Sequence, residues 1–336
     1  MKKFMHLFLR PRLLWLSLAY VSGVKKSRLF TVKPRPNAPY RAIVIGLDED
    51  YWAHFDAAYP EFEKLFARED VLLSELRLAF TYGDTAAIVF HRTNRRKLAA
   101  SVDGTNTVVF EGTAAPVPVL AKNGEYAYGF ALDSAGKWLA PRRPTEFSII
   151  LENFNFEGRQ AFLDEASLIV KALKIEPPAS EKCLVITHNN DAEEVRQQIN
   201  SELLEVAKAT VADVPHSLFS SSDDEWWKPE VQGAFIELIQ NCTTVVTHSS
   251  PLGMIALLAG RTVKVTGRPV WAGFGLEGEN SSVYRRRSLT MTEFAALLMF
   301  VLSRYVDDSG NVVDPLDGWE LPMAAKPSKG ISLPSG

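Results

Sequence analysis

The chain alternates short apolar runs with amphipathic stretches, and this alternation constrains its fold more than any other feature. The pattern is clearest between residues 180 and 305. Short, apolar and β-branched runs predict buried strands at Cys183–Thr187, Thr243–Thr247 and Thr262–Thr266. Helical periodicity predicts helices over Ala192–Ala209, Glu230–Gln240, Pro251–Ala259 and Met291–Tyr305. Strands that alternate with helices indicate parallel βαβ units, so the predicted fold class is α/β.

A less regular α/β region precedes this one. The strands predicted there are Arg41–Leu47, Ala86–His91, Thr107–Glu111, Tyr126–Leu132 and Phe147–Leu151. The predicted helices are Tyr59–Arg68, Val71–Leu78 and Phe162–Leu173. Because Pro177 and Pro178 separate the two regions, we predict an N-terminal α/β domain over 41–178 and a Rossmann-like domain over 179–320. The Pro/Ser/Gly/Lys-rich residues 321–336 are expected to form a frayed tail.

The charge is distributed unevenly along the chain. Residues 1–47 hold ten of the 37 Lys and Arg residues and no acid, so the remainder carries 27 bases against 40 acids. A net charge of −3 argues against bulk nucleic-acid binding. Leu13–Val24 is too short to span a bilayer, which needs about 20 residues. We therefore interpret 1–40 as a basic amphipathic segment and linker at a membrane surface; internal packing and a signal peptide are the alternatives.

The two cysteines give little sign of special chemistry. Cys183 and Cys242 both lie in apolar runs, and no Cys or His spacing suggests a metal site. Buried thiols in a reducing cytoplasm are the expected state, and a disulfide between them is the alternative.

Polar or titratable residues follow several predicted strands. Ligands of open α/β sheets bind beyond the carboxyl ends of the strands, so these positions are candidate site residues. They are Glu152, His188 to Asp191, His216, and His248 to Ser250.

The segment Thr247–Gly253 joins a predicted strand to a predicted helix. Ser250 suits the N-cap position and Pro251 the first helical position. Free amides there, together with the Ser249 and Ser250 hydroxyls, would favour a phosphate; a plain helix cap is the alternative. The only GxGxxG spacing, Gly273–Gly278, does not directly join a predicted strand to a predicted helix, and no GxxxxGK[ST] motif is present, so neither a dinucleotide cofactor nor a P-loop is expected.

Two motifs in the C-terminal third resemble a known family. The first is the run Val246–Leu276, which ends in Gly267-Arg268-Pro269-Val270-Trp271-Ala272-Gly273-Phe274-Gly275-Leu276. The second is the cluster Arg285-Arg286-Arg287, followed by an apolar helix that ends at Arg304-Tyr305. Together they resemble the capsular polysaccharide biosynthesis family, which includes the bacterial β-Kdo transferases.

The resemblance implies a glycosyltransferase of GT-B-like architecture, with a cleft between two Rossmann-like α/β domains. It implies transfer of Kdo or a related sugar from a CMP-activated donor to a lipid-linked saccharide, with retention and without a metal or cofactor. The C-terminal domain would hold the nucleotide sugar and the N-terminal domain the acceptor. The enzyme would be cytoplasmic and peripheral to the inner membrane, with other capsule assembly proteins as further partners and no nucleic acid.

The resemblance also suggests roles for individual residues. Glu152 matches the general acid/base, although the second acid and the Gly of that motif are missing. Asp191 matches the nucleophile of a double displacement, and a helix N-cap is its alternative role. His216 stands in a Pro-His pair, where the family has His-Pro beside the nucleotide phosphate. The remaining predicted substrate-binding residues are His188, Thr247, His248, Ser249, Ser250, Gly253, Arg285 and Arg286.

Two other functions are compatible with these observations. A member of the same family that has lost its acids would be a non-catalytic capsule polysaccharide export or assembly protein. An unrelated nucleotide-handling α/β enzyme, such as a phosphatase or an epimerase, is the other possibility.

Overall fold

The computed structural model describes residues 30–33, 40–67, 85–90, 108–115, 119–120, 126–133, 145–178, 182–187, 193–210, 216–220, 229–307 and 309–313. The predicted helix Val71–Leu78, the tail 321–336, and most of the predicted segment 1–40 lie outside these residues. The chain divides into two compact units. The first comprises Met1–Thr113, Phe130–Gly136 and Gly310–Val312, and the second comprises Ala114–Gly129, Lys137–Ser309 and Val313–Gly336.

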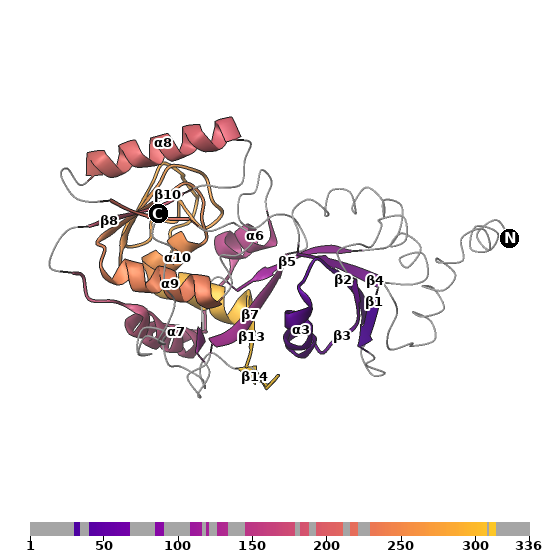
Figure 1. The fold of residues 1–336 in the computed structure, drawn as a ribbon. Coiled ribbons are helices and arrows are strands. Elements are labelled where there is room, and N and C mark those ends of the chain that lie inside the picture. The colour runs from indigo at the N-terminus through magenta and orange to yellow at the C-terminus, as the bar shows by residue number, and fades with distance from the viewer. Residues whose placement is uncertain are drawn as a thin grey trace. The chain divides into compact units, whose positions relative to one another are not determined.

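The first unit is built on a mainly parallel sheet (Figure 1). Its strands are β1 (Phe30–Lys33), β2 (Tyr40–Ile45), β3 (Phe62–Ala67), β4 (Thr85–Val89) and β5 (Val109–Ala114). They lie in the order β1-β3-β2-β4-β5, and β1 alone of these five runs antiparallel to its neighbour. The short 3₁₀ helix η1 (Glu49–Tyr51) and helix α3 (Trp52–Ala58) connect β2 to β3. The strands predicted near residues 41, 86 and 107 are thus confirmed.

The predicted helix over Tyr59–Arg68 is wrong, because most of this segment forms strand β3. Its charged residue Lys64 is fully buried. The ammonium group donates to the Asp56 carboxylate at 3.1 Å and to the carbonyl oxygens of Phe62 at 2.9 Å and Tyr59. Lys64 therefore occupies a core position that a hydrophobicity pattern would give to an apolar residue. The helix prediction for this segment failed because the pattern does not show that a lysine can be buried there.

The second unit contains a fully parallel five-stranded sheet in the order β12-β11-β10-β8-β9. These strands are β8 (Cys183–Ile186), β9 (His216–Phe219), β10 (Thr244–Thr247), β11 (Thr262–Val265) and β12 (Glu279–Ser281). Helices α8 (Glu193–Thr210), α9 (Pro229–Gln240) and α10 (Leu252–Leu258) follow β8, β9 and β10 respectively. The strands predicted at Cys183–Thr187, Thr243–Thr247 and Thr262–Thr266 are confirmed, and so are the helices predicted at Ala192–Ala209, Glu230–Gln240 and Pro251–Ala259.

Helices cover both faces of this sheet, α8 on one side and α9 and α10 on the other (Figure 1). Alternation along β8 explains why. Cys183 and Val185 pack with Leu203 of α8, whereas Leu184 and Ile186 belong to the large core that includes α10. Successive residues of a strand point to opposite faces, so a strand covered on both sides reads as a continuous apolar run. Both cysteines are buried free thiols.

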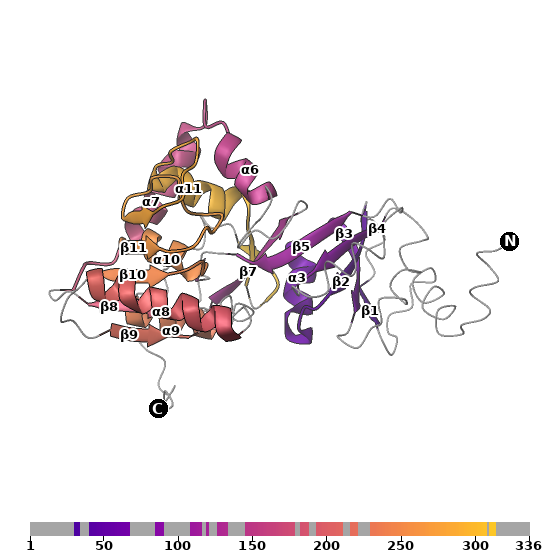
Figure 2. The ribbon, with the colours of Figure 1, turned by 90° about the horizontal axis from the view of Figure 1, so that it is seen from above.

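The second unit also contains helices α6 (Glu146–Asn153) and α7 (Gln160–Leu173). Helix α7 packs beside α11 (Met291–Ala296), as Figure 2 shows. The sequence places both α6 and α7 in the domain 41–178, whereas in the structure they belong to the compact unit that holds the parallel repeat. The apolar face of α7, with Ala166, Ile169 and Leu173 buried, accounts for this association.

The predicted strand Phe147–Leu151 is wrong, because this segment lies within α6. Thr145 and Ser148 form a reciprocal capping box: the Ser148 amide donates to the Thr145 hydroxyl at 3.0 Å, and the Thr145 amide donates to the Ser148 hydroxyl at 2.9 Å. Phe147 and Leu151 are buried at helical spacing, while Ile149 between them is 48% exposed. A strand would place all three on one face.

The predicted helix Met291–Tyr305 is also too long. Helix α11 passes into a π-helical turn, η3 (Leu297–Val301), and strand β13 (Arg304–Val306) follows. The Ser303 hydroxyl donates to the Leu298 carbonyl at 2.6 Å and satisfies the end of the helix. The remaining strands are β6 (Val119–Leu120), β7 (Tyr126–Asp133) and β14 (Val312–Val313). Within the described ranges, no helix has both the length and the hydrophobicity needed to cross a bilayer.

Candidate functional site

The bend Thr247–Gly253 lies at the carboxyl edge of the parallel sheet, between β10 and α10. Thr247 is buried, whereas His248, Ser249 and Ser250 are half-buried. The bend is therefore neither sealed in the core nor fully exposed. Its polar side chains lie where the ligands of open α/β sheets bind.

The hydrogen bonds of the bend are largely internal. The Ser250 amide donates to the Thr247 hydroxyl at 3.2 Å, and the Leu252 amide donates to the Ser250 hydroxyl at 3.3 Å. The amides of Gly253 and Met254 donate to the carbonyls of Ser250 and Pro251. Helix α10 begins at Leu252 with Pro251 at its N-cap position, one residue later than predicted, and the Ser250 side chain contributes only the hydroxyl that accepts from the Leu252 amide. A phosphate that binds here would have to compete for these amides or use other donors.

Two glycines let the backbone pack closely around the bend. A Cβ atom on Gly267 would lie 2.3 Å from the carbonyl oxygen of His248, and the Gly267 amide donates to that oxygen at 3.0 Å. A Cβ atom on Gly253 would lie 2.7 Å from the indole of Trp271. The His248 Nδ1 atom lies 3.0 Å from the Thr266 hydroxyl, at the end of β11. The bend is therefore fixed against both α10 and the segment after β11.

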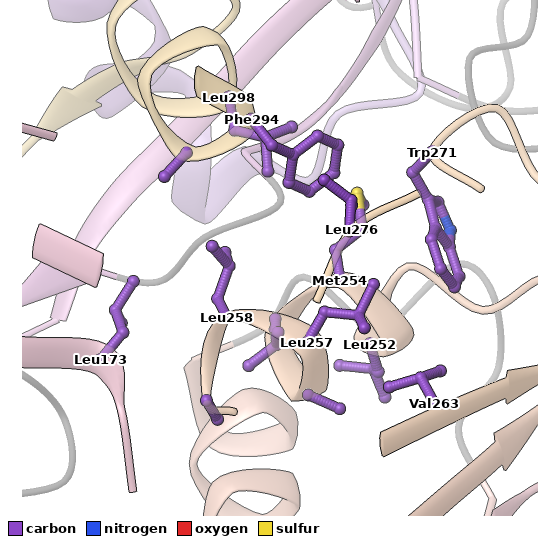
Figure 3. Close-up of a cluster of buried hydrophobic side chains, with 14 of the residues drawn as sticks. Leu173, Leu252, Met254, Leu257, Leu258, Val263, Trp271, Leu276, Phe294 and Leu298 are labelled. Atoms are coloured by element: carbon purple, nitrogen blue, oxygen red, sulfur yellow. The ribbon is translucent and has the colours of Figure 1, made fainter. Parts of the chain in front are cut away.

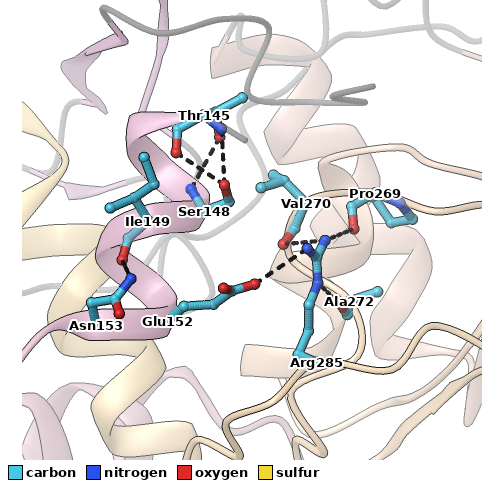
Figure 4. A network of polar contacts seen from close by, with 9 residues as sticks. All are labelled: Thr145, Ser148, Ile149, Glu152, Asn153, Pro269, Val270, Ala272 and Arg285. Atoms are coloured by element: carbon cyan, nitrogen blue, oxygen red, sulfur yellow. Dashed lines mark hydrogen bonds and ion pairs between the residues drawn. The ribbon is translucent and has the colours of Figure 1, made fainter. Parts of the chain in front are cut away.

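Arg285 ties the loop after β11 to α6 (Figure 4). Its guanidinium donates to the carbonyl of Ala272 at 3.2 Å and to those of Val270 and Pro269 at 3.4 and 3.5 Å. The same group lies 3.5 Å from the Glu152 carboxylate. Arg285 is therefore already engaged by protein groups that orient it.

The other two arginines of the cluster differ from each other. Arg287 donates to the Phe154 carbonyl at 2.6 Å and lies 3.8 Å from the Glu293 carboxylate. Arg286, between them, is exposed. The alternation along this extended segment turns Arg285 and Arg287 inward and leaves Arg286 as the member of the cluster that faces solvent.

Glu152 does not follow a strand, contrary to the sequence prediction. It lies in the last turn of α6, and its side chain is 35% exposed. Figure 4 shows the carboxylate directed toward Arg285. The structure thus brings together two predicted site residues, Glu152 and Arg285, through a helix that sequence reasoning did not place there.

His216 also lies elsewhere than predicted. It begins strand β9 instead of following a strand, and its register partner in β8 is Cys183, the first residue of that strand. The backbone of His216 is thus at the amino edge of the sheet, whereas Thr247 pairs with Ile186 at the carboxyl edge. The four-residue strands separate the two edges by about 10 Å at 3.3 Å per residue.

The remaining predicted site residues, His188 and Asp191, lie outside the described residues. The nucleophile assignment of Asp191 stays a prediction. Among the residues that the structure does describe, no group of three or more His, Cys, Asp or Glu is placed to hold a metal ion.

Sequence reasoning missed the part that Glu279 plays in the loop after β11. Its carboxylate accepts hydrogen bonds from the Gly273 amide and, at 3.3 Å, from the Leu276 amide. Gly273 and Gly275 have positive φ angles of 94° and 69°. The glycine spacing signals a tight turn, but the carboxylate that closes it is recognisable only once the chain is folded.

A family model described as "Capsule polysaccharide biosynthesis protein" matches residues 231–305. This segment is similar to the capsule polysaccharide biosynthesis family. It contains β10, the bend, α10, the loop after β11 and the arginine cluster, and so confirms the predicted resemblance. No curated protein matches the chain significantly by sequence.

Solved structures extend the likeness beyond this family segment. The chain is similar to the β-Kdo 2,7 transferase of Thermosulfurimonas dismutans KpsC, with 15% identity, a TM-score of 0.59, and coverage of 82% of this chain and 96% of that one. It is equally similar to the β-Kdo 2,4 transferase of the same KpsC, with 15% identity, a TM-score of 0.59, and coverage of 81% and 94%. These likenesses establish a common α/β fold.

Proposed function

We propose that this protein is a glycosyltransferase of capsule polysaccharide biosynthesis that transfers Kdo or a related sugar from a CMP-activated donor to a saccharide acceptor. The observation that carries the proposal is the position in the fold of residues 231–305, the segment that the family model matches. Residues 231–305 supply the carboxyl-edge bend and the loop that Arg285 holds, within a fold similar to two β-Kdo transferases. The polar part of the family segment thus coincides with the edge where α/β sheets bind ligands.

The half-buried Ser249 is suited to contact the donor. Its neighbours Ser250 and Thr247 use their hydroxyls within the bend, whereas the Ser249 hydroxyl makes no hydrogen bond within the part of the chain that the structure describes. The cation of Arg285 and the exposed Arg286 give the adjoining loop a positive charge that suits an anionic donor. The acceptor proposed here is a lipid-linked saccharide, and the basic segment 1–40 would contact the inner-membrane surface.

The direct test is incubation with CMP-Kdo and a lipid-linked saccharide, followed by mass spectrometry of the product. The expected result is an acceptor heavier by one Kdo residue, together with release of CMP. Asp191→Asn should abolish the product and preserve stabilisation by CMP, because it removes a nucleophile and leaves the bend intact. Absence of both product and CMP binding in the wild type would overturn the proposal.

A matched pair of serine variants tests the bend itself. Ser249→Ala should reduce the thermal stabilisation by CMP, whereas Ser282→Ala, at an exposed position on the loop before the arginine cluster, should leave it unchanged. Equal stabilisation of both variants would move the donor site away from the bend.

One observation favours a non-catalytic export or assembly protein as the second candidate. The Glu152 carboxylate is engaged by Arg285 and lies on a helix, not at a strand end. If Glu152 only anchors Arg285, Glu152→Gln should lower stability and leave capsule production intact. If it takes part in proton transfer, the same variant should bind CMP normally and lose transfer.

A further inference from the structure

Glu279 and Arg285 are hydrogen-bonded to the two ends of a single peptide group, the one that joins Ala272 to Gly273. The Gly273 amide donates to the Glu279 carboxylate, and the Ala272 carbonyl accepts from the Arg285 Nε–H at 3.2 Å. Because the peptide is trans, its N–H and C=O point in opposite directions within one plane, and the two contacts fix that plane together. The negative charge at one end and the positive charge at the other polarise the peptide in the same sense, which strengthens both hydrogen bonds.

The main chain of Arg285 is bonded to the same turn. Its amide donates to the Gly273 carbonyl at 3.1 Å. The φ angle of Gly273 is 94°, and a Cβ atom there would lie 2.8 Å from the Val283 carbonyl oxygen, so glycine lets the two segments approach this closely. The Glu279 carboxylate also accepts from the Leu276 amide at 3.3 Å. The turn that Glu279 closes therefore sets the position of both the main chain and the side chain of Arg285.

The contacts of the Arg285 guanidinium leave one of its corners available. Its Nε and Nη2 groups donate to the carbonyls of Ala272, Val270 and Pro269, as Figure 4 shows. The Nη1 group carries two N–H bonds and makes no hydrogen bond to a described residue. Its contact there is the ion pair with Glu152 at 3.5 Å, and the arginine side chain is 20% exposed. The loop carbonyls thus hold one edge of the guanidinium, and Nη1 is left to contact an anion.

Core packing holds both ends of this loop in place. Trp271 and Leu276 are buried, and Figure 3 shows both among the apolar side chains around α10. Burial of apolar side chains does not depend on a charge elsewhere in the loop. Loss of the Glu279 charge should therefore leave the loop folded and loosen the peptide between its two buried ends.

We propose that Glu279 is a positioning residue, which orients the Arg285 guanidinium through the Ala272–Gly273 peptide for contact with the anionic sugar donor. The inference rests on the proposed function and adds Glu279 to its site. Without the carboxylate, the peptide plane can rotate, and the Ala272 carbonyl no longer holds the Arg285 Nε–H in one direction. The guanidinium must then be ordered when the donor binds, and the entropy lost in that ordering lowers the affinity.

The test compares Glu279→Gln with a matched control, Glu277→Gln, in the full chain. Glu277 lies on the same loop, is exposed, and forms an exposed ion pair with Lys174 at 3.7 Å. Glu279→Gln should raise the Kd for CMP roughly fivefold, about the difference between a hydrogen bond to a charged group and one to a neutral group. Glu277→Gln should leave the Kd unchanged. A lower melting temperature of Glu279→Gln with an unchanged Kd would show a role in stability alone and would overturn the inference.

A double-mutant cycle determines whether Glu279 acts through Arg285. Arg285→Lys should weaken CMP binding, because one ammonium group cannot bond the loop carbonyls and the donor together. In the Arg285→Lys background, Glu279→Gln should raise the Kd further by less than about twofold. The same factor in both backgrounds, or an unchanged Kd for Arg285→Lys, would count against the proposed route through Arg285.

Nitrogen-15 NMR of the arginine Nε–H groups supplies a readout that needs no ligand, because Arg285→Lys identifies the Arg285 signal by its loss. That signal should shift in Glu279→Gln and stay in place in Glu277→Gln. An unchanged signal in Glu279→Gln would mean that the guanidinium keeps its orientation without the carboxylate, contrary to the inference. Glu279→Asp keeps the charge on a shorter side chain and should raise the Kd by a smaller factor; it replaces Glu279→Gln in each comparison if that variant does not fold.

The two proposals fail in different ways. If the wild type binds no CMP by NMR or thermal shift, the proposed donor is wrong, and the ligand-free NMR comparison still decides whether Glu279 orients Arg285. If the wild type binds CMP while Glu279→Gln binds it equally well and the Arg285 signal stays in place, the donor stands and the inference is wrong.

Discussion

Arg261 is a buried cation whose removal should destabilise the second unit. Its side chain is 1% exposed. It donates to three carbonyls from two segments distant in sequence: Ile239 at 2.9 Å, Ile175 at 3.0 Å and Glu176 at 3.1 Å. Burial lowers the pKa of Arg261 from its ordinary value, but an arginine remains protonated under all ordinary conditions. The guanidinium thus joins the end of α9 to the segment after α7.

The magnitude of the effect follows from these three bonds. Arg261→Met keeps much of the length of the side chain and leaves three carbonyls unsatisfied, at roughly 1–3 kcal/mol each. Relief of the cation's desolvation offsets part of this loss. We expect a net destabilisation of about 3–5 kcal/mol. At roughly 2–4 °C per kcal/mol, the melting temperature should fall by about 10 °C.

Urea and thermal unfolding of the full chain measure this change. Arg268→Met is the matched control, because Arg268 is exposed and its replacement should change the free energy of unfolding by less than about 0.5 kcal/mol. Arg261→Lys should fall between the two, since one ammonium group cannot reach all three carbonyls. A loss below about 1 kcal/mol for Arg261→Met would mean that the three bonds contribute little net stability.

Two further predictions concern the sheet and its bend. Gly267→Ala would place a Cβ atom 2.3 Å from the His248 carbonyl oxygen and should destabilise the protein by about 3 kcal/mol in urea unfolding. Gly158→Ala is the control, because its added Cβ atom meets open space. It should lower the free energy of unfolding by only about 1 kcal/mol, the cost of an alanine at a φ of 71°. Equal losses of stability in the two variants would contradict the steric argument for Gly267. Burial raises the pKa of the Cys183 thiol to about 11. Because the unfolded chain loses this proton first, stability is complete below pH 9 and falls between pH 9 and 11, by up to about 3 kcal/mol. Cys183→Ala should abolish this part of the alkaline loss, and identical pH profiles would count against it.

The local sequence pattern was sufficient to predict most of the strands and helices of the second unit. Strands β8 and β10 are short apolar runs buried at every position, and a strand buried on both faces is the expected structure at that length. The motif around Trp271 likewise indicates the family from consecutive residues alone. In both cases the information is contained in neighbouring residues.

Local pattern failed where distant contacts determine the environment. The run Phe147–Leu151 has strand-like composition, yet the capping box of Thr145 and Ser148 and the packing of Phe147 and Leu151 make it a helix. In β3, Lys64 is buried because acceptors from α3 and the turn after it surround its ammonium group. A hydrophobicity pattern contains none of these partners.

The order of residues along the chain was enough to place the polar bend Thr247–Gly253 directly after a strand of a parallel sheet. Three facts emerged only from the folded molecule: His216 begins its strand at the opposite edge, Arg285 engages Glu152, and the Trp271 N–H meets no acceptor among the described residues. The chemical groups that a side chain offers are a property of its residue type. Its partners depend on which segments meet in space, and that is set by the packing of the whole core.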